Sequence, residues 1–317
     1  MTLPICSVVI PTRNCLAYLS SALDSVRAQK IDGLEIIVVD DGSTDGTREW
    51  LRSRAATWLC LRVIDGPARG PARARNLALA AANADLIAFL DADDVWSEGK
   101  LSRQIAFHQR RPDVGFSFTD YLHIDRDGGT HGTCFDYWGF TPGRVAGSGF
   151  AVLHDPEATL LDANVVGTST VVARRRELQI ANGFREDLRS AEDWDLWLRL
   201  AARAPVAATP LSLMTYLMHR PGNLTGQVDD RIAAMSCIVD RYAGHGQPAF
   251  RRARRRAQAR LAEASAESAE LAQKPWRSLT HRLHALSLVP SRRVARASVA
   301  DALCAARALW RSPGSPQ

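Results

Sequence analysis

The sequence predicts an α/β protein in which a mostly parallel sheet is flanked by helices, followed by a C-terminal helical appendage. Three observations lead to this prediction. Short β-rich runs alternate with helical patterns along the first 95 residues, at the spacing of right-handed βαβ units. Each of these runs ends in a polar loop. From residue 249 the chain becomes rich in alanine and arginine, which favours helices.

Four buried strands are predicted in the first 95 residues, because each run is apolar and rich in β-branched residues. The runs are residues 7–10, 35–39, 59–64 and 86–90. Polar residues follow every one of them. Ligands of open parallel sheets collect beyond the carboxyl ends of the strands, so the four polar loops together predict a binding site.

Helices are predicted between and after these strands. Asn14 can cap the first helix, and Ser43 or Thr44 can cap the second. The alanine-rich residues 72–82 form the third helix, and residues 100–109 form an amphipathic fourth. These helices supply the crossover connections that parallel strands require.

The elements beyond residue 110 are more widely spaced. Strands are predicted at residues 114–118 and 168–173, and a helix over residues 191–200 has apolar residues at helical spacing. Residues 125–156 are rich in glycine, aromatic and polar residues, which predicts a long, variable loop region. Loops of this length in a compact domain are usually functional or mobile.

Asp91, Asp93 and Asp94 directly follow the apolar run of residues 86–90. An Asp-x-Asp at the carboxyl end of a strand suits a hard divalent cation that also binds phosphate oxygens. Mg²⁺ or Mn²⁺ takes one or two protein carboxylates and leaves its other positions to water and phosphate. A solvated acidic turn is the alternative for an isolated Asp-x-Asp, but the neighbouring polar loops favour the site.

Composition and missing motifs exclude several classes of protein. With 46% hydrophobic and 23% charged residues, the chain resembles an ordinary soluble protein, and no apolar run approaches a transmembrane length. The chain enters a strand almost at once, and its six cysteines show no paired metal spacing, so we expect a cytoplasmic protein with reduced thiols. A P-loop and a dinucleotide-binding Gly-x-Gly-x-x-Gly are both absent from the sequence.

The basic charge belongs to the C-terminal part. Residues 249–317 hold 14 Lys and Arg against 4 Asp and Glu, whereas the whole chain has a net charge of +6. Helices are predicted at about residues 250–273, 276–288 and 294–310. A helical appendage with a solvated basic face, peripheral contact with an anionic membrane, and self-association remain open. Nucleic-acid binding is disfavoured, because residues 251–256 lack interleaved aromatic side chains.

Five motifs occur in order along the chain and together resemble family 2 glycosyltransferases of the GT-A fold. The motifs are SVVIPTRN (7–14), VVDDGSTD (38–45), ARN (74–76), FLDADD (89–94) and EDWDLWLR (192–199). The resemblance covers roughly residues 3–225 and implies a Rossmann-like sheet and a nucleotide-sugar donor. Residues 125–156 do not align clearly with the family, and their length and composition predict a lid or an acceptor-binding surface.

The resemblance and the composition of the tail together predict a division of the chain into domains. A catalytic domain would cover residues 1–225, with a nucleotide-binding half at 1–95 and an acceptor half at 96–225. A linker at 226–248, the basic helical appendage at 249–311 and a disordered tail at 312–317 would follow.

The same resemblance implies roles for individual residues. Asp193 would be the base that deprotonates the acceptor hydroxyl, and Asp93 would hold Mn²⁺ or Mg²⁺ on the diphosphate. His219 would be a weaker contact to the metal or phosphate, with a plain surface histidine as the alternative. The nucleotide-sugar site would comprise Pro11 and Arg13 beside the base together with Thr12, Asp41 recognising the base, Arg75 supporting that pocket, and Asp91 on the ribose with Ala92 beside it.

The expected function is metal-dependent, inverting transfer of a sugar from a nucleotide sugar, expected to be UDP-linked, to the hydroxyl of a saccharide or lipid-linked saccharide. Bacterial cell-surface polysaccharide or glycoconjugate synthesis is the expected setting, with the protein cytoplasmic or peripheral at the inner face of the membrane. A sugar-phosphate nucleotidyltransferase and a non-catalytic nucleotide-sugar-binding protein are the alternatives. A nucleotidyltransferase is expected to have a glycine-rich phosphate loop after the first strand, and residues 11–14 do not provide one.

One electrostatic question stays open in the sequence. A helix N-terminus should keep Asp193 ionised, which is the form that a base needs. The neighbouring Glu192 has the opposite effect, because a second negative charge raises the pKa of a carboxyl group. The sequence does not decide between the two.

Overall fold

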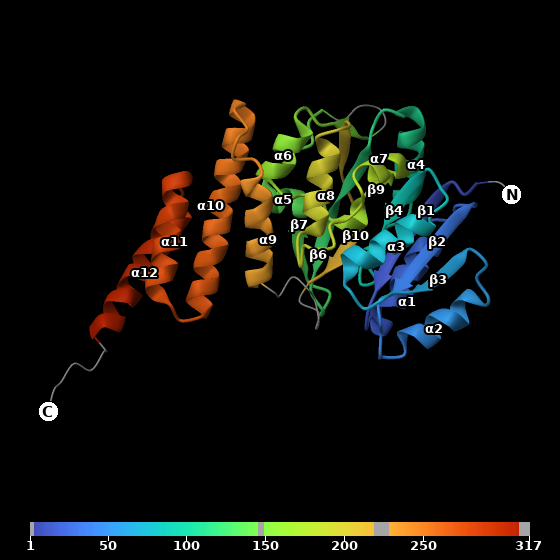
Figure 1. Ribbon diagram of the computed structural model, residues 1–317, viewed down its shortest axis with the longest axis horizontal. Helices are drawn as coiled ribbons and strands as arrows, with labels where there is room; N and C mark the ends of the chain where they lie inside the picture. The colour runs from blue at the N-terminus through green and yellow to red at the C-terminus, as the bar shows by residue number, and fades with distance from the viewer. Residues whose placement is uncertain (1–2, 145–148, 219–227, 311–317) are drawn as a thin grey trace. The chain divides into compact units, whose positions relative to one another are not determined.

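The computed structural model describes residues 3–144, 149–218 and 228–310, so His219 and the expected disordered tail lie outside the described residues. The chain divides into two compact units, which Figure 1 traces along the chain. We call the first, Met1–Leu160, Asn164–Leu188 and Glu192–Pro221, the α/β domain. The second, which we call the helical unit, comprises Leu161–Ala163, Arg189–Ala191 and Gly222–Gln317.

The α/β domain is built on one mixed sheet with the order β3-β2-β1-β4-β9-β6-β10-β5. β7 pairs with β6 and β8 pairs with β10 beside this path. The pairings make β1, β2, β3, β4, β6 and β10 run in the same direction, so the sheet is mostly parallel as predicted. The strands are β1 (Cys6–Thr12), β2 (Leu34–Asp40), β3 (Leu61–Asp65), β4 (Leu86–Phe89), β5 (Val95–Trp96), β6 (Phe116–Ile124), β7 (Thr130–Thr133), β8 (Ala151–Val152), β9 (Val172–Arg174) and β10 (Val206–Leu217).

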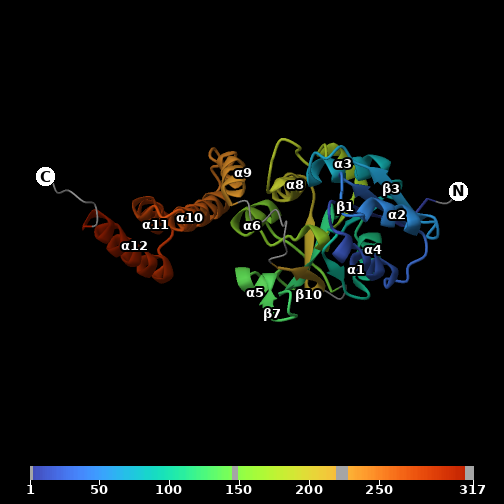
Figure 2. The same ribbon diagram turned by 90° about the horizontal axis from the view of Figure 1, so that it is seen from below.

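Helices cover both faces of this sheet, as Figure 2 shows. Alternate side chains of the central strands, such as Val8 and Ile10, pack with Leu19 and Leu23 of α1 in one core cluster. On the other face Phe89 of β4 meets Trp197 of α8, with ring centroids 5.7 Å apart. The helices are α1 (Leu16–Arg27), α2 (Thr47–Ala55), α3 (Pro71–Ala81), α4 (Lys100–Arg110), α5 (Cys134–Trp138), α6 (Pro156–Asp162), α7 (Arg175–Ile180) and α8 (Glu192–Ala201), with the 3₁₀ turn η1 (Thr168–Thr170).

The predicted helix caps were wrong. Asn14 has a positive φ of 50° and lies before the N-cap of α1. The side chain of Asp45 takes its place, because one carboxylate oxygen accepts the Leu16 amide of α1 at 3.1 Å. The other oxygen accepts the Thr47 amide of α2 at 3.1 Å. Asn14 instead joins the loops after β1 and β2, where its side-chain oxygen accepts the Thr44 amide at 2.8 Å.

Two other expectations differ from the structure. Residues 168–170 form the turn η1 instead of the start of a strand, and only Val172–Arg174 pair in the sheet. In the turn the Thr170 hydroxyl donates to the Gly167 carbonyl, and the amides of Thr170 and Val171 donate to carbonyls three residues earlier, which an extended strand would not allow. Residues 125–156 are not one long loop, because β7, α5 and β8 lie within them.

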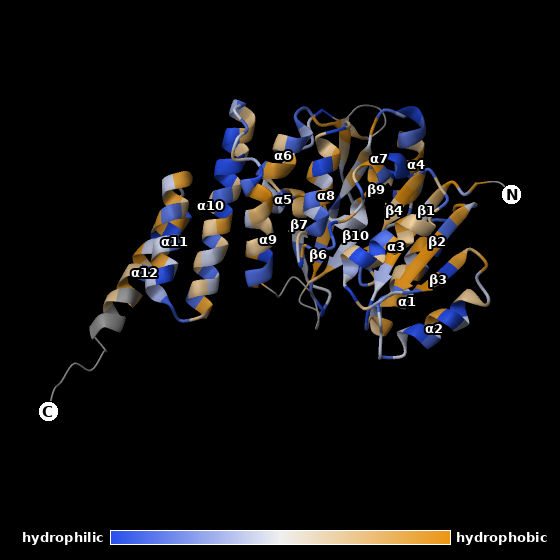
Figure 3. Cartoon of the chain, in the orientation of Figure 1, coloured by the Kyte–Doolittle hydropathy of each residue, from blue (hydrophilic) through white to orange (hydrophobic). Residues whose placement is uncertain are grey.

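The helical unit contains α9 (Val228–Asp240), α10 (Pro248–Leu271), α11 (Pro275–Leu288) and α12 (Arg292–Trp310). The three predicted C-terminal helices are confirmed within a few residues, and α9 lies in the segment expected as a linker. Figure 3 shows mixed hydropathy on α10, α11 and α12, unlike the mostly hydrophobic strands β1 and β2. Their small core joins Ala262, Ala285 and Val294. Among the described residues, none of the helices is both long enough and apolar enough to span a membrane.

Candidate active site

The acidic loop at residues 91–94 directly follows β4 and is fixed to the turn η1. Asp94 is buried, and its Oδ2 accepts a 2.5 Å hydrogen bond from the Ser169 hydroxyl. The backbone amide of Asp91 donates to the same hydroxyl oxygen at 2.9 Å. Asp94 therefore shapes the loop from inside, whereas Asp91 and Asp93 are partly exposed on either side of the buried Ala92.

Arg75 of α3 joins the acidic loop to the start of α8. Its side chain is only 6% exposed, with Nη2 2.6 Å from Asp91 Oδ1 and Nη1 2.9 Å from Glu192 Oε1. The guanidinium also lies over the ring of Phe184, 5.3 Å from its centroid. Burial lowers the pKa of Arg75, but the charges of Asp91 and Glu192 outweigh it and raise the pKa overall. The arginine therefore stays charged between two carboxylates.

Asp193 stands next to Glu192 at the start of α8 and is half-buried. Its Oδ2 accepts a hydrogen bond from Thr168 Oγ1 at 2.9 Å, and its Oδ1 accepts the Trp194 amide at 2.7 Å. Burial raises the pKa of Asp193 above its ordinary value, although Arg75, the Trp194 amide and the Thr168 hydroxyl oppose this. The pKa of Glu192 is raised for the same reason. Desolvation thus decides the question that the sequence left open.

The residues expected around the nucleotide base lie at the ends of two adjacent parallel strands. Thr12 at the end of β1 pairs in register with Asp40 at the end of β2, and Pro11 precedes it within β1. Arg13 follows and is exposed. Thr12 is 4% exposed, and its hydroxyl has no hydrogen-bond partner among the described residues. A buried hydroxyl in this state is expected to bond to a ligand or to water.

The paired aspartates after β2 have different surroundings. Asp40 is fully buried and contacts Arg48 at 2.9 Å. Asp41 is 3% exposed, and its two carboxylate oxygens accept the amides of Arg69 and Gly70 at 3.2 and 2.6 Å. Asp41 therefore orders the loop after β3 beside the expected base pocket. Gly66 allows this close approach, because a Cβ at that position would lie 2.8 Å from Asp41 Oδ1.

The carboxylates of the acidic loop suit a metal ion that is also bound by the phosphate oxygens of a ligand. Among the described residues, no group of three or more His, Cys, Asp or Glu side chains is arranged to hold a metal by itself. Mg²⁺ and Mn²⁺ do not need such a cage at a diphosphate, since one or two carboxylates suffice. The partly exposed Asp91 and Asp93 fit this requirement, whereas the buried Asp94 is committed to Ser169.

Sequence reasoning missed the contacts of three residues of this site. Thr168 and Ser169 hold Asp193 and the acidic loop, and Glu192 provides the second partner of Arg75. Thr168 and Ser169 lie in a run rich in β-branched residues, which favours a strand and conceals the turn. Glu192 was considered in the sequence as a neighbouring charge, but its contact with Arg75 was missed because the two residues are 117 positions apart.

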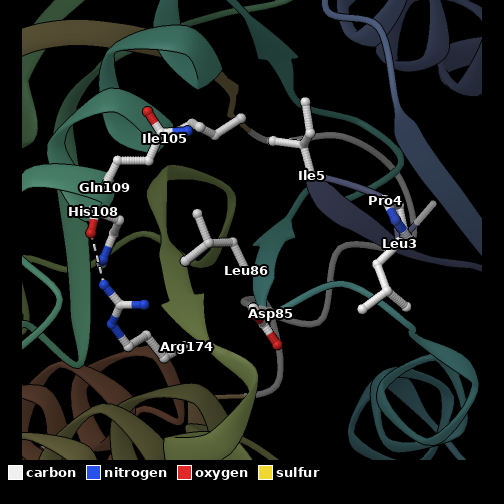
Figure 4. A pocket seen from close by; sticks show the side chains of 9 residues that line it. All are labelled: Leu3, Pro4, Ile5, Asp85, Leu86, Ile105, His108, Gln109 and Arg174. Carbon is white, nitrogen blue, oxygen red and sulfur yellow. Dashed lines mark hydrogen bonds between the residues drawn. The ribbon is translucent and has the colours of Figure 1, made fainter.

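A hollow of about 300 Å³ lies away from these residues, at the amino ends of the parallel strands. Figure 4 shows Arg174 beside His108, where a guanidinium N–H donates to the backbone oxygen of His108 at 2.7 Å. Burial and the charge of Arg174 lower the pKa of His108 to about 4, so the imidazole is neutral. The residues that line the hollow are Leu3, Pro4, Ile5, Asp85, Leu86, Ile105, His108, Gln109 and Arg174.

Comparisons with known proteins agree with this architecture. The family model described as "Glycosyl transferase family 2" matches residues 7–145. TuaG of Bacillus subtilis (strain 168) is named, provisionally, as a glycosyltransferase of teichuronic acid biosynthesis. It is 32% identical to this chain over 205 residues, which cover 62% of this chain and 72% of that protein. The UDP-Glc:alpha-D-GlcNAc-diphosphoundecaprenol beta-1,3-glucosyltransferase WfaP of Escherichia coli is 35% identical over 122 residues, 38% of this chain and 47% of WfaP.

A solved structure supports the same fold. The mannosyltransferase PcManGT from Pyrobaculum calidifontis, in complex with GDP-Man and Mn²⁺, superposes with a TM-score of 0.63 over 98% of this chain and 82% of that protein, at 22% identity. The chain spans only about a third of the length of several other glycosyltransferases that it matches. Sequence motifs, sheet topology and relatives thus agree, and the chain belongs to glycosyltransferase family 2, with the GT-A fold.

Proposed function

We propose that the protein transfers a sugar from a nucleotide sugar to an acceptor hydroxyl, with inversion at the anomeric carbon. The observation that supports this best is the bridge made by Arg75 between Asp91 and Glu192. This bridge brings the loop suited to a diphosphate next to Asp193, the carboxylate suited to act as a base. Both groups lie at the edge where ligands of parallel sheets collect.

Asp193 is proposed to accept the proton of the acceptor hydroxyl as that oxygen attacks the anomeric carbon. The bond from the anomeric carbon to the diphosphate oxygen breaks in the same step, and the nucleoside diphosphate leaves. A base contributes about 10²–10⁴-fold to such a reaction and works best when its pKa is close to the operating pH. The raised pKa of Asp193 supports this role. A single displacement needs no covalent intermediate and inverts the configuration.

Asp93 is proposed to hold Mn²⁺ or Mg²⁺ on the diphosphate. The bound ion would neutralise the charge that develops on the leaving group. The remaining oxygen of Asp91 is proposed to contact the ribose, since its Oδ1 is already held by Arg75. Pro11, Thr12, Arg13 and Asp41 would surround the base. The buried Thr12 hydroxyl supports a ligand at this end of β1.

A UDP-linked donor and a lipid-linked saccharide acceptor are part of the proposal. The name of WfaP, which gives UDP-Glc as donor and a diphosphoundecaprenol acceptor, supports both. TuaG supports a setting in bacterial cell-surface polysaccharide synthesis. PcManGT carries GDP-Man on the same fold, so the nucleotide itself has to be tested.

Peripheral contact with the inner face of a membrane would bring the enzyme to such an acceptor. Large apolar side chains are exposed on the helical unit, among them Val299 and Leu303 of α12 at 62% and 57% exposure. Arg292 and Arg296 are exposed on the same helix, at the spacing that places all four side chains on one face. Apolar side chains flanked by arginines suit an anionic lipid surface.

Turnover and binding should be measured separately on the full chain. A thermal-shift screen of nucleotide sugars with Mn²⁺ identifies the donor, because a bound ligand raises the melting temperature. With that donor and an undecaprenyl-diphosphate-linked sugar, we expect turnover that EDTA abolishes and Mn²⁺ or Mg²⁺ restores. Asp193→Asn is expected to lower kcat about 10²–10⁴-fold without weakening donor binding. Asp93→Ala is expected to weaken binding of the metal and donor.

The exposed Asp24→Asn on α1 is the matched control, and its turnover should equal that of the wild type. Full activity of the Asp193 variant would contradict the assignment of the base. Donor binding without turnover across acceptors would instead favour a nucleotide-sugar-binding protein. Transfer of a nucleotidyl group to a sugar phosphate would favour a nucleotidyltransferase, although membership of family 2 argues against it.

A further inference from the structure

The turn η1 contacts both halves of the candidate site through neighbouring residues. Thr168 Oγ1 donates to Asp193 Oδ2 at 2.9 Å. Ser169 Oγ accepts the Asp91 amide at 2.9 Å and donates to Asp94 Oδ2 at 2.5 Å. One residue of the turn thus holds the carboxylate at the start of α8, and the next holds the acidic loop after β4.

The turn is itself fixed by the core. The indole N–H of Trp96 donates to the Ser169 carbonyl at 2.7 Å, and the buried Gln104 side chain donates to the Thr170 carbonyl at 3.0 Å. Gly167 lies against Tyr121, since a Cβ on this glycine would come within 2.9 Å of the ring. Ser169 and Thr170 are 1% and 0% exposed. A turn held on all sides can define the position of the groups that it contacts.

The Thr168 hydroxyl has a specific electrostatic effect on Asp193. Burial and the charge of Asp91 disfavour the ionised carboxylate, whereas the charge of Arg75, the Trp194 amide and the Thr168 hydroxyl favour it. The other carboxylate oxygen, Oδ1, accepts the amide of Trp194. Thr168 and this amide together restrict rotation of the carboxylate group, which a base needs for alignment with a bound hydroxyl.

We propose that Thr168 is a positioning residue for sugar transfer, whose hydroxyl favours the ionised form of Asp193 and orients it toward the donor site that Ser169 fixes in the same turn. This inference rests on the proposed role of Asp193 as the base. Thr168 itself need not touch either substrate. The turn would then fix the position of the base relative to the diphosphate site through η1, in parallel with the Arg75 bridge.

The test compares Thr168→Val, which keeps the shape and removes the hydroxyl, with Thr168→Ser, which restores it. The pH dependence of kcat is measured on the full chain with the donor and acceptor found above. The acidic limb is the fall of kcat at low pH, where Asp193 becomes protonated. For Thr168→Val we expect this limb to shift to higher pH by about one pH unit, because a hydrogen bond to the charged carboxylate is lost. At neutral pH kcat should fall roughly tenfold while donor affinity by calorimetry stays unchanged. Thr168→Ser should restore the limb.

Thr170→Val is the matched control in the same turn. Its hydroxyl donates only to the Gly167 carbonyl among the described contacts, so its loss should lower the melting temperature without moving the acidic limb. A Thr168→Val enzyme with the wild-type pH profile would overturn the inference. So would a loss of activity that Thr168→Ser does not restore, since that indicates a purely structural role.

Asp193→Asn, measured in parallel, separates this inference from the proposed function. If Asp193→Asn is inactive and Thr168→Val behaves like the wild type, only the role of Thr168 is wrong. If Asp193→Asn retains full turnover, both the base assignment and the role of Thr168 are wrong. Loss of turnover in Asp193→Asn with a shifted acidic limb in Thr168→Val supports both.

Discussion

At the scale of single residues, the balance of charge around Arg75 controls the candidate site. One buried guanidinium contacts Asp91 and Glu192, and its charge also acts on Asp193. The single positive charge of Arg75 does not offset the desolvation of Glu192 and Asp193, so the pKa values of both carboxyl groups are raised. Buried charges are expensive unless they are paired, and their retention at one site indicates a functional use.

Because burial raises the pKa of Asp193, its ionised carboxylate should destabilise the folded protein at pH values above that raised pKa. A carboxyl group whose folded pKa is raised binds more protons in the native state than in the unfolded state within that window. Stability therefore falls as the pH rises through the window from the ordinary value toward the raised one, and stays lower above it. We expect Asp193→Asn to be more stable than the wild type at neutral pH, by about 0.5–2 kcal/mol.

Urea unfolding at several pH values between about pH 4 and pH 8 tests this expectation. The advantage of Asp193→Asn should shrink as the pH falls, because the wild-type carboxyl becomes protonated and loses its penalty. Asp24→Asn on the exposed side of α1 should show no such pattern. A variant that is less stable than the wild type at neutral pH would contradict the electrostatic account of Asp193.

Residues of the site differ in how well the sequence predicts them. Asp91, Asp93 and Asp193 could be predicted from local sequence patterns, because the first two follow a strand and the third lies in the first turn of a helix. The contacts of Arg75 span 16 and 117 positions and depend on the strand order, which the local pattern does not encode. Thr168 and Ser169 carry no local signal, because a hydroxyl in a β-rich run fits a strand as well as a turn.

At the scale of elements, Asp45 connects two helices through one side chain. Its carboxylate accepts the first amide of α1 and the first amide of α2. Hydrogen bonds from Thr47 and from the Leu16 amide hold the pKa of Asp45 below its ordinary value, although partial burial raises it. The loops after β1 and β2 are thereby fixed together, and these loops carry Arg13 and Asp41.

Asp45→Ala is expected to destabilise the protein by about 1–2 kcal/mol, because two helix N-termini lose a cap. The pKa of Asp45 is lowered in the folded state, so its contribution is present above the ordinary carboxyl pKa. That contribution is lost as the pH falls through the lowered value. Urea unfolding at neutral and acidic pH measures both effects, with Asp24→Ala as the control. Equal destabilisation at all pH values would show that the charge of Asp45 does not matter.

Elements with a local hydrophobic pattern were predicted more reliably than those that depend on partners elsewhere. The strands before the acidic loop and the three C-terminal helices appear within a few residues of their expected positions. The caps were wrong because Asp45 reaches the first helix from the following loop. Residues 125–156 looked unstructured because β7 and β8 are short, and because β8 pairs with β10, which is far away in sequence.

At the scale of the whole molecule, the chain combines a catalytic architecture with a basic helical unit. The excess of positive charge lies in residues 249–317, where 14 Lys and Arg stand against 4 Asp and Glu. On α12 the residues Val294, Ser298 and Asp301 are buried against other helices of the unit. Arg292 and Arg296 lie on its opposite face with Val299 and Leu303. This amphipathic arrangement gives one outward face both charge and apolar area.

Binding to lipid vesicles tests whether this face contacts membranes. We expect the full chain to co-sediment with vesicles that contain phosphatidylglycerol and not with pure phosphatidylcholine, and to dissociate at high salt. A double variant Arg292→Glu and Arg296→Glu should weaken binding at least about tenfold, since each arginine near an anionic surface contributes about 1 kcal/mol. The variant Val299→Asp with Leu303→Asp should do the same through lost apolar contact.

Arg103→Glu with Arg110→Glu on α4 gives a control with the same change in net charge, because both arginines are exposed on the α/β domain. If this control weakens vesicle binding as much as the α12 variants, net charge alone explains the binding and the α12 face has no specific role. Sedimentation without lipid detects self-association, and a dimer that only the α12 variants disrupt would assign this face to a second copy of the chain. Vesicle binding that the α12 variants lose and the α4 control retains would place the lipid contact on α12.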